Sequence, residues 1–241
     1  DRDDTYIGYN TQCFRPSNIY LDNKCFLITT PSIDVPKIFF VRKDNRTGFG
    51  TEGHVHDDFG HFTYINYNGE GIIDPGIYLY QDEPKSCKAK YHNFPFSDKL
   101  EQMKFRARFH RIPSHHTKIT DNTNVLCLSK CNDNFVVSRV INKDTLTIDD
   151  YLFSHNEFHF TCTWCFYINY TKSKELTYSS NVFSLDDVAR FKLNKSCSFE
   201  FINSFYYPNY GIKKACRKLI VTYDQDIGAN SKVKLLEFQT I

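Results

Sequence analysis

The segment from Glu157 to Tyr170, EFHFTCTWCFYINY, is the longest candidate β-strand in the chain. Its first part, Phe158 to Cys162, alternates apolar and polar side chains with the period of two that is typical of a half-buried strand. Aromatic residues dominate the whole segment, which favours a strand over a helix. Extended structure is therefore our starting hypothesis for the chain.

Nine other segments have a similar composition, and turn-forming sequences such as Asn68-Gly69 separate them. The predicted strands cover residues 24–30, 37–42, 61–67, 76–80, 103–110, 134–141, 157–170, 198–203, 218–223 and 232–239. Two short helices are predicted, one beginning at Ser97 and one capped by Ser184 and running to Leu193. This pattern predicts an all-β antiparallel sandwich forming a single domain over residues 1–241, with a division into two β domains near residue 150 as the alternative.

The composition indicates a globular chain and excludes several classes of protein. Hydrophobic residues make up 41% and charged residues 24% of the 241 positions, as in ordinary globular domains. The net charge of +2 gives no general attraction to nucleic acid. The apolar runs are far shorter than the roughly 20 residues of a membrane-spanning helix. The 22 Phe and 16 Tyr against one Trp and one Met suggest an A/T-rich genome, which we interpret as viral or parasitic.

Nine cysteines are spread along the chain, and we interpret them as four disulfides plus one leftover thiol in an oxidising compartment. The sequence begins with aspartate rather than methionine, which is consistent with removal of a signal peptide. Asn45, Asn169 and Asn194 begin sequons for glycosylation. We expect a secreted protein, or one displayed on a virion or cell surface, with these cysteines in an unknown pairing: Cys13, Cys25, Cys87, Cys127, Cys131, Cys162, Cys165, Cys197 and Cys216.

The stretch Gly53 to His61, GHVHDDFGH, is a candidate metal site. His54, His56 and Asp58 would share one face if the segment were extended, and zinc and iron bind imidazole and carboxylate groups. The pattern is similar to the HxHxDH motif of metallo-β-lactamase-type hydrolases but places the last histidine too late. Nearby glycines favour a solvated loop, so a metal-dependent hydrolase or oxygenase centred on this stretch is the alternative function.

Other catalytic patterns are missing from the sequence. It contains no glycine-rich phosphate loop, no nucleophile elbow and no dinucleotide fingerprint. We therefore predict no catalytic residue and no organic cofactor, and we favour a binding protein over an enzyme.

A basic segment, Lys104 to Arg111, is the first predicted binding surface. In one continuous strand its basic side chains would share a face opposite the apolar ones. Guanidinium groups bind oxyanions bidentately, so this face suits a sulfated glycan, an acidic protein or phosphate. The residues predicted to bind are Arg106, Arg108, His110 and Arg111.

An aromatic segment is the second predicted binding surface. Phe205, Tyr206, Tyr207 and Tyr210 surround a Pro-Asn pair that predicts a loop. Exposed aromatic side chains of this kind are common in interface hot spots.

These features together predict a secreted or surface-displayed glycoprotein domain that binds a host macromolecule. Attachment to a host receptor and capture of a cytokine or chemokine are the roles that we expect. A small-ligand β-barrel, with aromatic side chains lining its cavity, is a second alternative.

Overall fold

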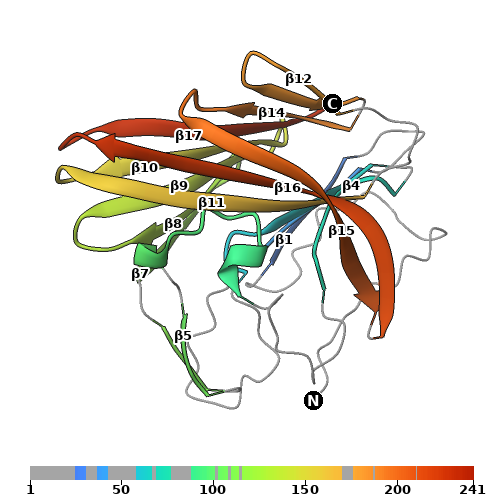
Figure 1. The fold of residues 1–241 in the computed structure, drawn as a ribbon, viewed down its shortest axis with the longest axis horizontal. Coiled ribbons are helices and arrows are strands. Elements are labelled where there is room, and N and C mark those ends of the chain that lie inside the picture. The colour runs from blue at the N-terminus through green and yellow to red at the C-terminus, as the bar shows by residue number, and fades with distance from the viewer. Residues whose placement is uncertain are drawn as a thin grey trace.

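A computed structural model gives the architecture of the chain. It describes residues 25–30, 37–42, 58–66, 69–76, 88–100, 103–107, 110–113, 116–169, 176–186, 188–209 and 211–241. Nearly all regular structure in these residues is antiparallel β-strand, arranged in two large sheets (Figure 1). The predicted β-sandwich architecture is therefore confirmed.

The first sheet has seven strands in the order β1-β2-β3-β4-β11-β16-β15. The second has eight, in the order β12-β13-β14-β17-β10-β9-β8-β7. Strands of the first sheet are β1 (Cys25–Thr30), β2 (Lys37–Arg42), β3 (Phe62–Ile65), β4 (Gly71–Ile73), β11 (Phe158–Asn169), β15 (Cys197–Asn209) and β16 (Ile212–Ile227). Strands of the second are β7 (His116–Asp121), β8 (Val125–Cys131), β9 (Phe135–Asn142), β10 (Thr147–Ser154), β12 (Leu176–Ser179), β13 (Val182–Leu185), β14 (Ala189–Leu193) and β17 (Lys232–Thr240).

The core lies between the two sheets and is rich in aromatic rings. Phe62 and Phe166 come from the first sheet, and Phe191 and Phe238 from the second. All four are fully buried, and ring centroids from opposite sheets approach to 4.8 Å for Phe62–Phe238 and 4.9 Å for Phe166–Phe191. Such tilted and edge-on pairs add to the hydrophobic stabilisation of the sandwich.

The helix predicted from Ser184 to Leu193 is wrong. This stretch forms parts of β13 and β14, joined by a turn. Residues 189–193 alternate between buried and exposed positions, a period of two that suits a strand and not a helix. The prediction at Ser97 becomes a single 3₁₀ turn, η3 (Asp98–Leu100), and η2 (Ala89–Tyr91) is equally short. Within the described residues no helix is long and apolar enough to cross a membrane.

The single strand predicted from Met103 to His110 is also wrong. The chain reverses here to form a separate hairpin of β5 (Met103–Ala107) and β6 (His110–Pro113). Ala107 pairs with His110 across the hairpin, so the basic residues of this segment do not follow one another along one strand.

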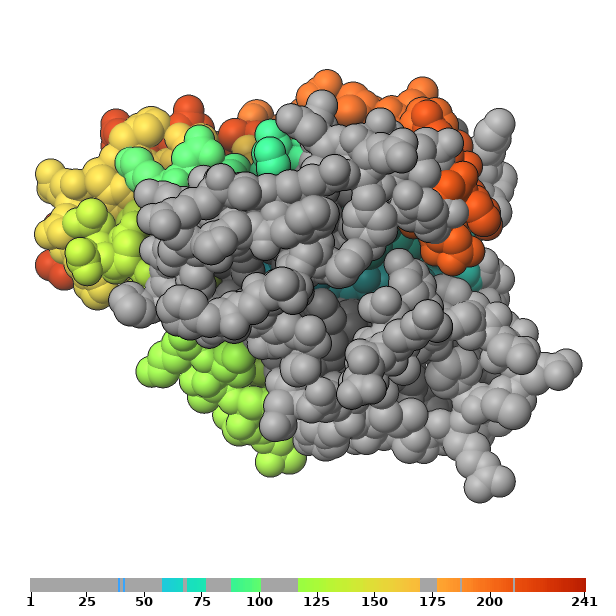
Figure 2. Space-filling view, turned by 90° about the horizontal axis from the view of Figure 1, so that it is seen from below, coloured from blue at the N-terminus to red at the C-terminus, as the bar shows by residue number. Residues whose placement is uncertain are grey.

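The hairpin of β15 and β16 is the longest structural element of the first sheet. Its strands have 13 and 16 residues, far more than the two short strands predicted there. Figure 1 shows the two strands curving away together from the rest of the sandwich. In Figure 2 the orange end of this hairpin lies at the right of the molecule, and the yellow residues near the β10–β11 turn lie at the left.

Candidate metal centre

Three side chains of types that can ligate a metal meet at one edge of the short strands of the first sheet. His61 directly precedes β3, Asp74 directly follows β4, and His92 directly follows η2. Asp74 Oδ2 lies 3.4 Å from His61 Nε2 and 3.6 Å from His92 Nδ1. The exposed fractions of His61 and His92 are 2% and 1%, whereas the Asp74 side chain is 38% exposed. The cluster is therefore closed by protein on two sides and open to solvent at Asp74.

The spacing of these atoms fits a tetrahedral metal site. The potential ligand atoms of the three residues all lie within 4.8 Å of one another. Zinc bonds to histidine nitrogen and carboxylate oxygen are about 2.0–2.2 Å long, which puts two ligand atoms of a tetrahedron about 3.4 Å apart. The two separations to Asp74 are close to this value.

Asn93 joins the segments that carry the two histidines. Its side-chain Oδ1 accepts from the amide of Phe62 at 3.0 Å, and its Nδ2 donates to the carbonyl of Phe62 at 2.7 Å. Its backbone amide donates to His61 Nδ1 at 3.3 Å. The buried Asn93 side chain thus bonds the backbone of Phe62 as a neighbouring strand would. This pairing holds His61 and His92 at a fixed separation.

A fully buried arginine supports the same two segments from within the core. Arg139 donates to the carbonyls of Gly60 at 2.7 Å and of Asn93 at 2.6 Å. It also makes two bonds to Asp150, at 2.8 and 2.7 Å, and Trp164 Nε1 donates to the same carboxylate at 2.8 Å. Arg139, Asp150 and Trp164 are all 0% exposed. Charge-assisted, bidentate bonds of this kind fix geometry strongly, so the network positions both histidines.

The hydrogen bond to His61 also determines where its proton lies. Nδ1 accepts from the amide of Asn93, so a neutral His61 carries its proton on Nε2, facing Asp74. If a metal were bound at Nε2, the neutral ring would carry its single proton on Nδ1 instead, and the contact with the Asn93 amide would have to lengthen.

A small second cluster of buried residues lies beside the site, on the face of the first sheet that points away from the main core. It contains Ile65, Ile73, Cys165, Tyr167 and Cys216, with Tyr206 packed against it. Burial raises the pKa of the Cys165 thiol, and it raises the pKa of Cys216 to about 12. Both thiols are therefore protonated near neutral pH and are poor nucleophiles and poor metal ligands.

Of the predicted metal ligands, His61 alone is among the three clustered residues. Asp58 is buried and begins the turn in which the His61 amide donates to its carbonyl at 2.8 Å. His54 and His56 lie outside the described residues. Sequence analysis missed Asp74 and His92, because Asp74 was assigned only to a turn and His92 is far along the chain. The Asp74-Pro75-Gly76 turn, which ends β4, was the sequence signal that could have indicated the position of Asp74.

The predicted basic surface is only partly described. Arg106 lies in β5, and His110 and Arg111 lie in β6. Arg108 is outside the described residues. As binding residues, all four stay a prediction.

The predicted aromatic loop is largely a strand. Phe205, Tyr206 and Tyr207 lie in β15, and Tyr210 is outside the described residues. The amide of Tyr207 donates to the carbonyl of Pro75 at 2.9 Å, so this end of β15 is tied to the residues that follow Asp74. The histidine stretch and the aromatic segment, treated separately in the sequence, are thus neighbours in the fold.

The predicted set of four disulfides is not found. No disulfide joins any two of the six cysteines that the structure describes, which are Cys127, Cys131, Cys162, Cys165, Cys197 and Cys216. Cys162 and Cys197 pair with Tyr223 from opposite sides, which separates their Cα atoms by two strand spacings, about 9.5 Å. A disulfide needs a separation below about 7 Å. The side chains of Cys13, Cys25 and Cys87 lie outside the described residues.

Two of the three sequon asparagines use their amide nitrogens within the fold. Asn169 Nδ2 donates to the carbonyl of Gly69, and Asn194 Nδ2 donates to the carbonyl of Lys234, both at 2.9 Å. Asn45 lies outside the described residues. Glycosylation at these positions stays a prediction.

Comparison with known proteins gives similarity in fold alone. No family model and no curated protein sequence matches the chain. Its fold is similar to a mutant of the heparan sulfate lyase HepC from Pedobacter heparinus, with a TM-score of 0.63 and 12% identity over 91% of this chain. A heparinase III gene product gives a TM-score of 0.63 at 14% identity over 92% of this chain. The chain spans 35% of the length of each of these proteins.

Proposed function

We propose that this chain is a metal-binding β-sandwich in which His61, Asp74 and His92 bind one divalent ion. The observation that carries the proposal is the convergence of these side chains, from three separate segments, with ligand atoms within 4.8 Å of one another. Two imidazoles and a carboxylate form a ligand set that suits zinc.

The proposed ion would add a further link between three segments that short strands and the hydrogen bonds of Asn93 and Arg139 already hold together. The flanking strands β3 and β4 have four and three residues, which is short for independent pairing. Binding of an ion to the folded state alone stabilises it by about 4 kcal/mol when the free ion is at 1,000 times its Kd. Three protein ligands leave a fourth position, on the solvent-exposed side of Asp74, for water or an anionic group.

Metal content and thermal stability test this proposal. We expect the wild-type protein to retain one zinc ion per chain after desalting and to unfold at a higher temperature with zinc than with chelator. His92→Gln should abolish both effects. His159→Gln is the matched control, because His159 also contacts two aspartates, Asp224 and Asp226, but lies on the solvent side of β11 and is exposed.

A spectroscopic readout makes the test independent of stability. Zinc at His61 Nε2 should shift the backbone amide resonance of Asn93, because the hydrogen bond to Nδ1 is lost. Retention of no divalent metal by the wild type, or equal retention by His92→Gln, would contradict the proposal.

We also propose that the chain binds an acidic polysaccharide. Support comes from its fold, which is similar over nine-tenths of its length to that of heparan sulfate lyase HepC. The end of the β15–β16 hairpin adds exposed cations at Lys213 and Lys214. A sulfated glycan is among the partners that the sequence analysis names. A host receptor or cytokine partner, a viral or parasitic source and secretion stay predictions.

Retention on immobilised heparan sulfate tests the second proposal. We expect retention at low ionic strength that weakens as salt screens the charges. Retention equal to that on a neutral polysaccharide matrix would refute it, without bearing on the metal site.

A further inference from the structure

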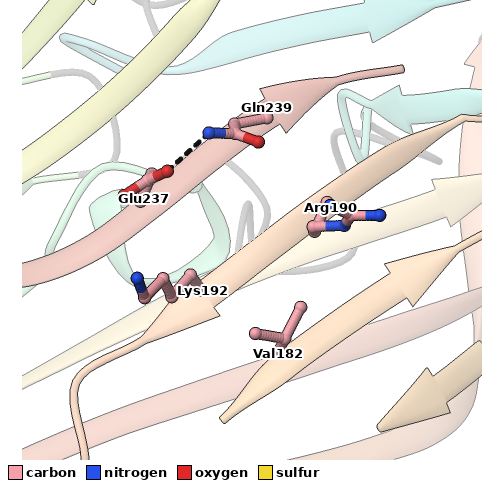
Figure 3. Close-up of a pocket in the computed structure, with 5 residues that line it drawn as sticks. All are labelled: Val182, Arg190, Lys192, Glu237 and Gln239. Atoms are coloured by element: carbon pink, nitrogen blue, oxygen red, sulfur yellow. Dashed lines mark hydrogen bonds between the residues drawn. The ribbon is translucent and has the colours of Figure 1, made fainter. Parts of the chain in front are cut away.

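A hollow of about 310 Å3 lies on the solvent side of the second sheet. Val182 of β13, Arg190 and Lys192 of β14, and Glu237 and Gln239 of β17 line it (Figure 3). Strand register places these residues in two cross-strand rows. One row is Val182–Lys192–Glu237 and the other pairs Arg190 with Gln239. Residues paired directly across antiparallel strands share a face, so all five point to the same side.

The hollow has a rigid floor and long side chains around it. On the opposite face of the same strands, Phe183, Phe191 and Phe238 are buried in the core at 1%, 0% and 0% exposure. Val182 is short, whereas the four other lining residues are long, so the space above Val182 stays unfilled. Its volume falls at the lower end of the range for small-molecule sites, roughly 300–1,000 Å3.

Two neighbouring side chains already donate hydrogen bonds to the Glu237 carboxylate at the hollow. Glu237 Oε1 accepts from Gln239 Nε2 at 2.6 Å, and Oε2 accepts from Lys234 Nζ at 2.7 Å. The bond from Lys234 lowers the pKa of Glu237, so Glu237 is an anion held in place. Figure 3 shows the amide oxygen of Gln239 turned away from Glu237. It is therefore available to accept a hydrogen bond from a ligand.

Positive charge remains at the hollow after this pairing. Lys234 is shared between Glu237 and Asp149. Arg190 Nε donates to the Ser184 hydroxyl at 3.4 Å, and within the described part of the chain Arg190 forms no ion pair with a carboxylate. The charged groups at and beside the hollow are three cations, Arg190, Lys192 and Lys234, and two anions, Asp149 and Glu237. The surplus charge lies on the side of β14.

We propose that this hollow binds one carboxylate-bearing sugar unit, a hexuronate, of an acidic polysaccharide. The Arg190 guanidinium receives the carboxylate in its bidentate fork, and Lys192 adds a second cation. The Gln239 amide oxygen accepts from a ring hydroxyl, and the apolar face of the sugar ring lies on Val182. This assignment rests on the proposed polysaccharide binding and gives it a location distant in sequence from the metal centre.

Calorimetric titration with a heparosan hexasaccharide, an unsulfated chain of alternating glucuronate and N-acetylglucosamine, tests the assignment. We expect Arg190→Met to weaken binding at least tenfold, because a charge-assisted bidentate contact is lost. Arg190→Lys should recover only part of the affinity. Lys232→Met is the matched control: Lys232 lies on β17 and stacks over Tyr151, outside the lining of the hollow, and its loss should change affinity less than twofold.

The outcomes separate the site from the polysaccharide proposal. Unchanged affinity in Arg190→Met, or equal binding of a hexasaccharide whose carboxyl groups are reduced to alcohols, would overturn the hollow as the site and leave polysaccharide binding intact. Binding of heparan sulfate without any binding of heparosan would do the same. No binding of either glycan by the wild type would overturn both.

Discussion

Replacing Arg139 with methionine tests whether the buried network under the metal centre has the stability that its geometry implies. Methionine keeps most of the side-chain length but removes the charge and every donor. Asp150 would keep only its bond from Trp164 at 0% exposure. The carbonyls of Gly60 and Asn93 would lose their arginine donors.

The expected loss in free energy of unfolding is about 3–5 kcal/mol, because removing one partner strands a buried charge. The carbonyl groups of Gly60 and Asn93 would each lose a hydrogen bond, at a cost of about 1 kcal/mol or more. The loss in free energy of unfolding should therefore lie toward the upper end of this range. A chain of this size loses about 2–4 °C in Tm per kcal/mol, so Tm should fall by roughly 6–20 °C. Urea denaturation followed by circular dichroism measures the loss, with Arg190→Met as an exposed-arginine control expected to change stability by at most about 0.5 kcal/mol.

A double variant separates a stranded charge from lost packing. Arg139→Met combined with Asp150→Leu removes both charges of this buried network, so it should be less destabilised than the sum of the single variants by roughly 1–3 kcal/mol. A loss below about 1 kcal/mol in Arg139→Met alone, or strict additivity in the double variant, would refute the reasoning. Zinc retention should fall in parallel, because Arg139 positions both histidines.

Three other predictions follow from the structure. Gly76→Ala should destabilise the protein more than Gly69→Ala, because both glycines have positive φ but only at Gly76 would a Cβ lie 2.0 Å from the Tyr207 carbonyl oxygen; chemical denaturation compares the two, and equal losses would contradict the steric argument. The intact mass with and without reductant should differ by at most two protons. Six of the nine cysteines are thiols, and the other three can form one disulfide at most. A shift of eight protons would restore the four-disulfide prediction. Hydrogen bonds that His159 donates to Asp226 and Asp224 raise its pKa above 6.5, so an NMR titration should give a higher midpoint that Asp226→Asn lowers. Their contribution to stability is present below pH 6.5 and disappears as pH rises through the folded-state pKa, and a midpoint at or below 6.5 would contradict it.

The long aromatic strand β11 was predictable from the sequence, whereas β10 was not. The segment 157–170 was assigned to within one residue at each end, as β11. By contrast, β10 has Ile148, Asp150, Leu152 and Ser154 at its buried positions, so a buried carboxylate and hydroxyl interrupt the pattern. Its charge is balanced by Arg139 on the neighbouring strand, and such a partner is visible only once the register is known.

The candidate site was predictable only in part, for a related reason. His61 lies in a conspicuous histidine-rich stretch, whereas Asp74 and His92 are brought to it by the β3–β4 hairpin and by the hydrogen bonds of Asn93. The hydrogen bonds of Asn93 join residues 31 and 32 positions apart. Local composition carries no information about them.

The position of β17 in the second sheet has a consequence for how the chain acquires its structure. This strand, Lys232–Thr240, is the last in sequence, yet it lies between β14 and β10 in the middle of the sheet. The β12–β14 meander therefore cannot join β7–β10 until residue 240 has left the ribosome. Pairings this distant in sequence form slowly and leave apolar surface exposed meanwhile. We expect the second sheet to close only after β17 has been synthesised, with the apolar faces of its two parts exposed until then.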